Sequence, residues 1–222
     1  MEITAIITHW YPERTKYLRG IIDALKAGSV VPDEIIIFNN LPEPLDFKDV
    51  TVINSNHNFS TLAKQFCAVA AKNKCILFQD NDLMVGRDTV KELYEFYLKN
   101  KDCFVGKWGK RMAAGDKPYS EGQNIAEGEV DVVAGALNMC GRELVIQALT
   151  DREKYKQDIW RVEDIAMSFS NTKRGGKNYA LNVEVVELPE ENIGLWHEPE
   201  HFIIRDKFVK DETSAGNIKR QE

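Results

Sequence analysis

The sequence predicts a one-domain α/β protein, built on a mostly parallel central sheet with helices on both sides. Short apolar runs alternate with amphipathic helical patterns through the first half of the chain, as they do in repeated β-α-β units. The runs are apolar at successive positions, which is typical of strands buried on both faces. The 222 residues contain no linker, repeat or low-complexity tract, so we expect a single core.

The first half contains four expected strands and three expected helices. The strands are expected at residues 3–8, 34–40, 50–56 and 74–80. The first helix follows Pro12, because the next apolar residues recur at i, i+3, i+4 and i+7, namely Leu18, Ile21, Ile22 and Leu25. The second helix is expected from about 60 to 72, and the third near 90–98.

The second half is less regular. A strand is expected near 103–108, whereas Gly109–Gly128 has no periodicity and is expected to form a long loop or an irregular lobe. The remaining expected elements are a strand, a small-residue turn, a strand and a helix over 129–149, a helix from about Val162 to Gly175, a strand over 178–188, and a polar, frayed tail over 211–222.

Charge and hydropathy exclude several classes of protein. There are 29 basic and 35 acidic residues, a net charge of −6, with no dense Lys/Arg cluster before the last few residues, so we expect no nucleic-acid partner. No apolar run approaches the roughly 18 residues of a membrane span. The first residues, MEITAIITHW, do not resemble a signal peptide. We therefore expect no transmembrane segment and a soluble, cytoplasmic protein.

The cysteines predict neither a metal clip nor a disulfide framework. They are far apart, mostly in apolar surroundings, and none belongs to a C-x-x-C motif. They are Cys67, Cys75, Cys103 and Cys140. Buried free thiols in a reducing compartment fit this pattern.

Two acids, Asp80 and Asp82, flank Asn81 directly after the apolar run of the fourth strand. Like charges at the end of a buried strand repel each other unless solvent or a cation lies between them. Asp and Asn also favour solvated turns, so the triplet alone leaves a turn and a cation site both open. Its oxygen ligands are those that Mg²⁺, Mn²⁺ or Ca²⁺ prefer over zinc.

Polar residues also follow the first two strands, at Thr8 and at Asn39–Asn40. In open α/β sheets, ligands bind beyond the carboxyl ends of the strands. Thr8, Asn39 and the triplet are therefore expected to face one crevice. This placement favours a ligand site over a solvated turn.

The order of these motifs resembles the GT-A fold glycosyltransferases, particularly family 2, over roughly Ile3 to His201. Small size and the absence of a membrane helix also resemble the short glycosyltransferase domains of large algal viruses. The motifs are AIITHWYPERTKYLRGIIDAL (5–25), EIIIFNN (34–40), LAKQF (62–66), QDNDLM (79–84, the D-x-D motif), GALNMCGREL (135–144) and WRVEDIAMSF (160–169). The sequence departs from the family at Asn39, where an acid is usual, at Lys64, where Arg is usual, and at NHNFSTL (56–62), which lacks a glycine.

The resemblance implies a metal-dependent transferase that moves a hexose from a nucleotide diphosphate sugar to a hydroxyl of a glycan or glycoprotein, with inversion. A UDP-linked donor is expected, because this family uses uridine nucleotides most. It implies Mn²⁺ or Mg²⁺ held by Asp82 with Asp80, and by His197 as a further ligand. Asp164 would be the general base and Glu163 would orient the acceptor. The donor residues would be Thr8, Asn39, Lys64, Asp80, Asn81, Gly135 and Ala136. Residues of about 1–108 would bind the nucleotide sugar and residues of about 109–210 the acceptor.

Other interpretations stay open at this stage. Glu163 and Asp164 also suit the first turn of a helix, where the dipole favours acids. A sugar-1-phosphate nucleotidyltransferase would place a Gly-rich phosphate loop after the first strand, and THWYPER (8–14) has no glycine. A retaining GT-A transferase shares the D-x-D motif. A non-catalytic carbohydrate- or cation-binding module would keep Asp80 and Asp82 but need no base.

Overall fold

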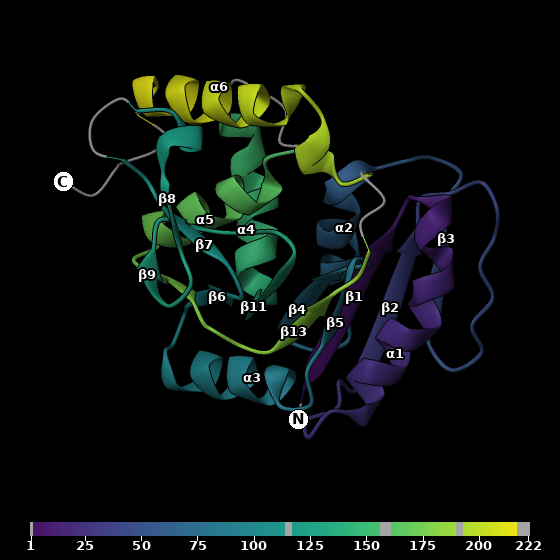
Figure 1. Ribbon diagram of the computed structural model, residues 1–222. Helices are drawn as coiled ribbons and strands as arrows, with labels where there is room; N and C mark the ends of the chain where they lie inside the picture. Colours follow the sequence, from purple (N-terminus) through teal and green to yellow (C-terminus); the bar gives the residue numbers. More distant parts are fainter. Residues whose placement is uncertain (1, 114–116, 156–160, 190–192, 217–222) are drawn as a thin grey trace.

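An eight-stranded sheet forms the centre of the computed structural model, which describes residues 2–113, 117–155, 161–189 and 193–216 (Figure 1). The strand order is β3-β2-β1-β4-β11-β6-β12-β9. The strands are β1 (Ile3–His9), β2 (Glu34–Asn39), β3 (Thr51–Asn54), β4 (Cys75–Asp80), β6 (Phe104–Gly106), β9 (Gly128–Val130), β11 (Leu137–Gly141) and β12 (Asn178–Ala180).

The first four strands along the chain form a parallel block, as predicted. β1 pairs in parallel with both β2 and β4, and β2 pairs in parallel with β3. All seven residues of β1 are buried, because helices cover both faces of the sheet at this point. β11 runs antiparallel to β4 and to β6, whereas β6 and β12 are parallel. The sheet is therefore mostly parallel, which confirms the predicted fold class.

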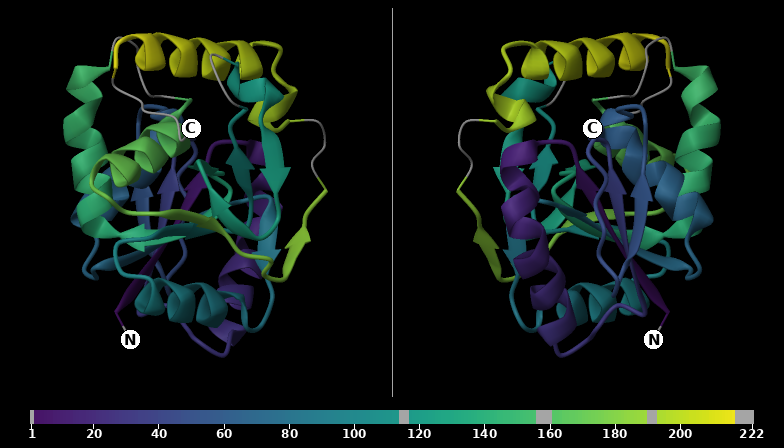
Figure 2. Two further views of the ribbon diagram at one scale, coloured as in Figure 1. Left: turned by 90° about the vertical axis from the view of Figure 1, so that its left-hand side faces the viewer. Right: turned by 90° about the vertical axis from the view of Figure 1, so that its right-hand side faces the viewer.

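Helices cover both faces of the sheet (Figure 2). Buried residues of α1 and α3 pack in one hydrophobic cluster, and those of α2 and α4 pack in a second cluster on the other face. The helices are α1 (Leu18–Ala27), α2 (Ala63–Ala70), α3 (Thr89–Lys99), α4 (Arg142–Asp151), α5 (Glu163–Lys173) and α6 (Glu200–Ser214). Short 3₁₀ helices are η1 (Pro12–Tyr17), η2 (Ser60–Leu62), η3 (Tyr119–Glu121), η4 (Arg152–Lys154) and η5 (Leu195–His197).

The segment Gly109–Gly128, expected to be a loop or irregular lobe, is more regular where the structure describes it. It contributes η3 and two strands of a three-stranded antiparallel sheet, in the order β10-β7-β8. The strands outside the central sheet are β7 (Gly109–Arg111), β8 (Gln123–Ile125), β10 (Val132–Val133) and a separate pair, β5 (Leu83–Val85) and β13 (Val185–Glu187). Strands of two or three residues are too short to show alternation in the sequence.

Helix α6 corrects the prediction of a frayed tail from residue 211. The helix continues to Ser214, and Glu212 is fully buried; residues 217–222 lie outside the described residues. Its buried face packs on α5 and η3 through a third cluster that contains Phe208, Val209 and Ile165. Figure 1 shows α6 lying across one end of the molecule, above α4 and α5. The chain thus closes one side of the fold with a packed helix.

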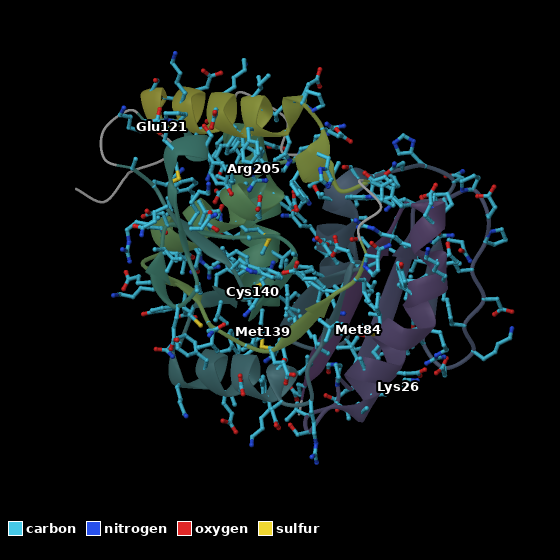
Figure 3. All side chains as sticks on the ribbon, in the orientation of Figure 1. Lys26, Met84, Glu121, Met139, Cys140 and Arg205 are labelled. Atoms are coloured by element: carbon cyan, nitrogen blue, oxygen red, sulfur yellow. The ribbon has the colours of Figure 1, made fainter. Side chains whose placement is uncertain are left out.

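The prediction of buried free thiols is confirmed: all four cysteines are unpaired and buried. Burial raises the pKa of Cys67, Cys75 and Cys103 to about 12, so these thiols stay protonated at neutral pH. Figure 3 shows Met139 and Cys140 of β11 in the interior. Among the described residues, no helix combines the length and the apolar character that crossing a membrane requires.

Candidate active site at the carboxyl ends of the central strands

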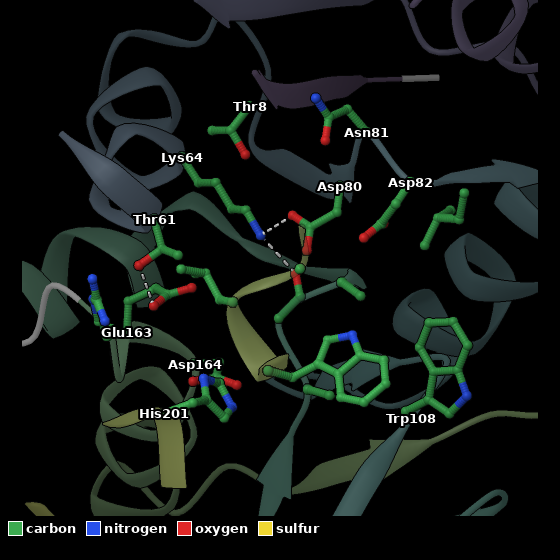
Figure 4. A pocket seen from close by; sticks show the side chains of 18 of the residues that line it. Thr8, Thr61, Lys64, Asp80, Asn81, Asp82, Trp108, Glu163, Asp164 and His201 are labelled. Atoms are coloured by element: carbon green, nitrogen blue, oxygen red, sulfur yellow. Dashed lines mark hydrogen bonds and ion pairs between the residues drawn. The ribbon is translucent and has the colours of Figure 1, made fainter. Parts of the chain in front are cut away.

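A cleft of about 740 Å³ opens where β1 and β4 end. Both halves of the chain line it, and it collects most of the residues that the sequence singled out. From the first half come Thr8, Lys64, Asp80, Asn81 and Asp82; from the second come Gly135, Ala136, Glu163 and Asp164. The cleft therefore brings the D-x-D motif and the Glu-Asp pair to one place (Figure 4).

Strand pairing explains how these segments meet. In the parallel pair of β1 and β4, Thr8 lies opposite Asp80. In the antiparallel pair of β4 and β11, Leu137 lies opposite Gln79, so the residues before Leu137 pass beside Asp80. The backbone N–H of Asp80 donates to the carbonyl of Ala136 at 2.7 Å. The backbone fold alone therefore places the small-residue turn against the first acid.

Lys64 links the two sides of the cleft. Its Nζ lies 2.5 Å from Oδ1 of Asp80 and donates to the carbonyl of Gly135 at 2.8 Å (Figure 4). The residue is 4% exposed. Burial alone would lower the pKa of Lys64, but the charges of Asp80 and Glu163 outweigh burial and raise it. Lys64 is therefore a fixed cation within the cleft.

Arg14 of η1 neutralises the second acid of the D-x-D motif. Its NH1 lies 3.0 Å from Oδ2 of Asp82 and donates to Oδ1 of Asn81 at 3.3 Å. The Asp82 side chain is one-quarter exposed, whereas that of Arg14 is almost wholly buried. Each acid of the motif thus has its own basic partner. The basic residue Arg14 had no predicted role.

Glu163 is a buried carboxyl group of the cleft with a raised pKa. Its Oε2 accepts a 2.5 Å hydrogen bond from the hydroxyl of Thr61. Burial, and then the negative charge of Asp164, raise the pKa of Glu163 to about 7. A Cβ atom placed on Gly135 would lie 3.4 Å from Oε1 of Glu163, so the second oxygen borders the turn beside Lys64.

Asp164 is held by an ion pair from the other end of the chain. Its Oδ2 lies 2.7 Å from NH2 of Arg205, and its Oδ1 accepts the backbone N–H of Ile165 at 2.9 Å. The guanidinium of Arg205 also donates to the hydroxyl of Tyr119 at 3.1 Å and lies over the Tyr119 ring at 4.5 Å. This arrangement fixes the Asp164 carboxylate at the start of α5.

Two predicted site residues do not line the cleft. Asn39 is fully buried, and its side-chain amide bonds to Glu43, Asn54 and the backbone of Leu41, so it orders its own loop. The ring of His197 stacks on Trp196 with centroids 3.7 Å apart, and the cleft lining does not include it. Neither side chain lies on the described lining of the cleft, and donor contact by Asn39 and metal ligation by His197 stay predictions.

His201, in contrast to His197, lines the cleft. Burial, and then the charge of Arg205, lower the pKa of His201 to about 4, so its ring is neutral at pH 7. Figure 4 draws it on the Asp164 side of the cleft rather than beside Asp82.

Sequence reasoning missed several residues that line the cleft. Some are aromatic and some are basic; they include Thr61, Trp108, Tyr119, Arg161 and Arg14. Arg14 follows β1 within the turn that faces the carboxyl ends of the strands, and that position was the available signal. Arg205 also lines the cleft, where it pairs with Asp164.

The cleft fits a divalent cation only if a ligand completes its coordination shell. Asp80 and Asp82 offer carboxylate oxygens at the end of β4. Within the described residues, no three His, Cys, Asp or Glu side chains gather into a ready metal site. Mg²⁺ is commonly bound by one or two carboxylates, and substrate phosphates complete its coordination shell. The donor set fits that arrangement, with Lys64 remaining beside Asp80 and Arg14 as the side chain that a cation on Asp82 would have to displace.

Comparison with known proteins identifies the fold. No protein-family model and no curated protein matches the sequence. Among solved structures, the chain is similar to GalNAc-T7, in its crystal structure with UDP, GalNAc and Mn²⁺, with a TM-score of 0.67. The identity is 13%, and the match covers 85% of this chain and 44% of that chain. This likeness shows the GT-A fold. The chain spans less than half the length of that protein.

Proposed function

We propose that this chain is a glycosyltransferase that moves a hexose from a nucleotide diphosphate sugar, UDP-linked, to a hydroxyl of a glycan or glycoprotein, with inversion. The observation that carries the proposal is that the D-x-D acids and the Glu163–Asp164 pair line one cleft of a GT-A fold. The UDP, GalNAc and Mn²⁺ bound to GalNAc-T7 support the choice of donor and metal. The membership of family 2 is part of this proposal.

In this proposal each half of the chain binds one of the two substrates. Residues of about 1–108 supply Thr8, Lys64 and the D-x-D acids on the donor side. Residues of about 109–210 supply the Glu163–Asp164 pair on the acceptor side. Trp108 and the half-exposed Trp196 line the cleft and offer faces on which the apolar side of a sugar ring can stack.

Asp82 and Asp80 would hold Mn²⁺ or Mg²⁺, which when bound supplies positive charge for the leaving diphosphate. Lys64 adds a fixed cation at the same end of the cleft and orders the Gly135 carbonyl. Charge that develops on the leaving group is then met by groups already in place, the most effective form of electrostatic catalysis.

Asp164 would act as the general base. The acceptor oxygen attacks the anomeric carbon, the bond from that carbon to the diphosphate oxygen breaks, and the hydroxyl proton passes to Asp164. Among the described residues, each Asp164 oxygen has one partner, so a lone pair remains for the hydroxyl. A single displacement of this kind inverts the anomeric centre through a transition state like an oxocarbenium ion. Glu163 would orient the acceptor.

The test is calorimetric titration of UDP and GDP, with and without Mn²⁺, against the wild type and Asp82→Ala. Micromolar, Mn²⁺-dependent binding that the variant loses would support the donor site. No binding of either nucleotide in the presence of metal would refute it. The anomeric configuration of the product, determined by NMR on any acceptor that reacts, separates inversion from retention.

A further inference from the structure

Arg14 is a buried cation whose donors are mostly unused. The residue is 4% exposed and lines the cleft from η1. Both of its polar contacts, to Asp82 and to Asn81, come from NH1 alone. Its Nε and NH2 are buried and have no hydrogen-bond partner among the described residues. A guanidinium carries five N–H donors, so the three on Nε and NH2 lack an acceptor.

A buried polar network sets the position of Arg14. His9 is fully buried, and burial, followed by the charge of Arg14, lowers its pKa to about 4. The neutral ring can therefore accept at Nδ1, which lies 2.7 Å from Nδ2 of Asn81, and donate from Nε2 to the Thr15 hydroxyl at 2.9 Å. This tautomer leaves the Asn81 carbonyl oxygen to accept from Arg14.

A buried arginine with unpaired N–H donors is suited to bind an anion that carries several oxygens. Leaving a buried donor unpaired costs about 1–3 kcal/mol, whereas the planar guanidinium matches phosphate with two parallel bonds. Charge balance points the same way. Arg14 and Lys64 cancel Asp80 and Asp82 in the structure. A divalent cation and a doubly charged diphosphate could enter together without disturbing that neutrality.

We propose that Arg14 is a diphosphate-binding residue that exchanges partners: it neutralises Asp82 in the structure, and on donor binding it turns its unused N–H groups to the phosphate oxygens and leaves Asp82 to the cation. The ligand class is a nucleoside diphosphate, so this inference rests on the proposed function. The assigned role of Asn81 changes with it, because that side chain, held by His9, orients Arg14 directly rather than contacting the donor itself.

The test compares UDP, UMP and uridine by calorimetry in Mn²⁺ for the wild type, Arg14→Gln and Arg14→Lys. Loss of charge-assisted hydrogen bonds predicts about 10- to 100-fold weaker UDP binding by Arg14→Gln. Uridine affinity should stay unchanged, and Arg14→Lys should fall between the two. The matched control is Arg19→Gln, which removes an exposed arginine of α1 that pairs with Asp23 and Asp49.

Titration of Mn²⁺ without nucleotide distinguishes the loss of a phosphate contact from misfolding, because a misfolded variant would not bind Mn²⁺ more tightly. Arg14→Gln removes the competitor for Asp82, so Mn²⁺ without nucleotide should bind several-fold more tightly than in the wild type, while UDP binds more weakly. If both Arg14 variants bind UDP as the wild type does, the inference is wrong and the proposed function stands. If Arg14→Gln does not fold, Arg14→Lys decides by the same comparison. If the wild type binds no nucleotide, the proposed function fails, and this inference with it.

Discussion

Asp164 and Arg205 form a buried ion pair, with Oδ2 of Asp164 2.7 Å from NH2 of Arg205 and both side chains less than one-tenth exposed. The arginine comes from α6 and the acid from the start of α5, so the pair joins two elements that the third hydrophobic cluster also packs together. Figure 3 places Arg205 beneath α6. The pair ties the proposed base to the docking of this helix.

Asp164→Asn should abolish transfer while it preserves nucleotide binding. The amide keeps the shape of the side chain but cannot take the proton, and a positioned base is worth about 10²–10⁴-fold in rate. Release of UDP in the presence of acceptor measures the rate, and calorimetry with UDP and Mn²⁺ measures binding. Undiminished transfer would refute the assignment of Asp164 and would favour a non-catalytic binding module, or Glu163 as the base.

Arg205→Met should lower the free energy of unfolding by about 3–5 kcal/mol, because removal of one partner leaves a buried charge unpaired. Urea denaturation followed by circular dichroism gives the value. The matched double variant, Arg205→Met with Asp164→Asn, should recover part of the loss because no buried charge remains. Equal losses in the single and the double variant would show that packing, not charge, accounts for the effect.

The pH dependence of stability and of transfer should reflect the ionisation of Glu163. Its pKa is raised from 4.5 to about 7, so the folded protein retains a proton that the unfolded chain has already released between these values. The contribution of Glu163 to stability, taken as the difference between the wild type and Glu163→Gln, should therefore fall as pH rises from 4.5 to about 7 and then level off. Taking the difference removes the opposite contributions of His9 and His201, whose pKa values are lowered to about 4. Transfer should rise through the same region if Glu163 must be ionised. Glu163→Gln should remove the rise in transfer, and a stability difference between the two proteins that stays constant from pH 5 to pH 8 would contradict this account.

Lys64→Met should destabilise the fold by about 1–3 kcal/mol, because the Gly135 carbonyl and the Asp80 carboxylate each lose a charge-assisted bond. It should also weaken UDP binding. Lys72→Met is the matched control, since Lys72 is 80% exposed and its change should be within about 0.5 kcal/mol. Equal unfolding midpoints for the two variants would show that the buried contacts of Lys64 contribute nothing.

The parallel half of the fold was predictable because its strands carry their signal locally. Strand β1 is apolar along its whole length and fully buried, so its sequence depends little on details of packing. The D-x-D acids could be placed by the same reasoning, since the end of β4 is also the end of a recognisable run. Ligands of open α/β sheets bind beyond the carboxyl ends of the strands, so Thr8 and the two acids could be predicted to lie at one edge of the sheet.

The rest depended on tertiary contacts that leave weak local patterns. The buried positions of α6, Arg205, Phe208, Val209 and Glu212, have helical spacing, but two of the four are charged, so the stripe does not look apolar. Asn39 is the last residue of β2, and its amide bonds to the loop that follows. Arg14 is ordinary in the sequence, and its role follows from a partner 68 positions away in the chain, Asp82.

Helix α6 also bears on the order in which the molecule matures during translation. Domains form from the amino terminus as the ribosome releases them. The parallel strands and the D-x-D acids emerge early, but Asp164 has its guanidinium partner only after Arg205 has left the exit tunnel and α6 has docked. A nascent chain arrested before residue 205 would have the metal-side acids in place and an uncompensated base. Stalled or prematurely ended products should therefore be inactive, and quality-control proteases should degrade them preferentially.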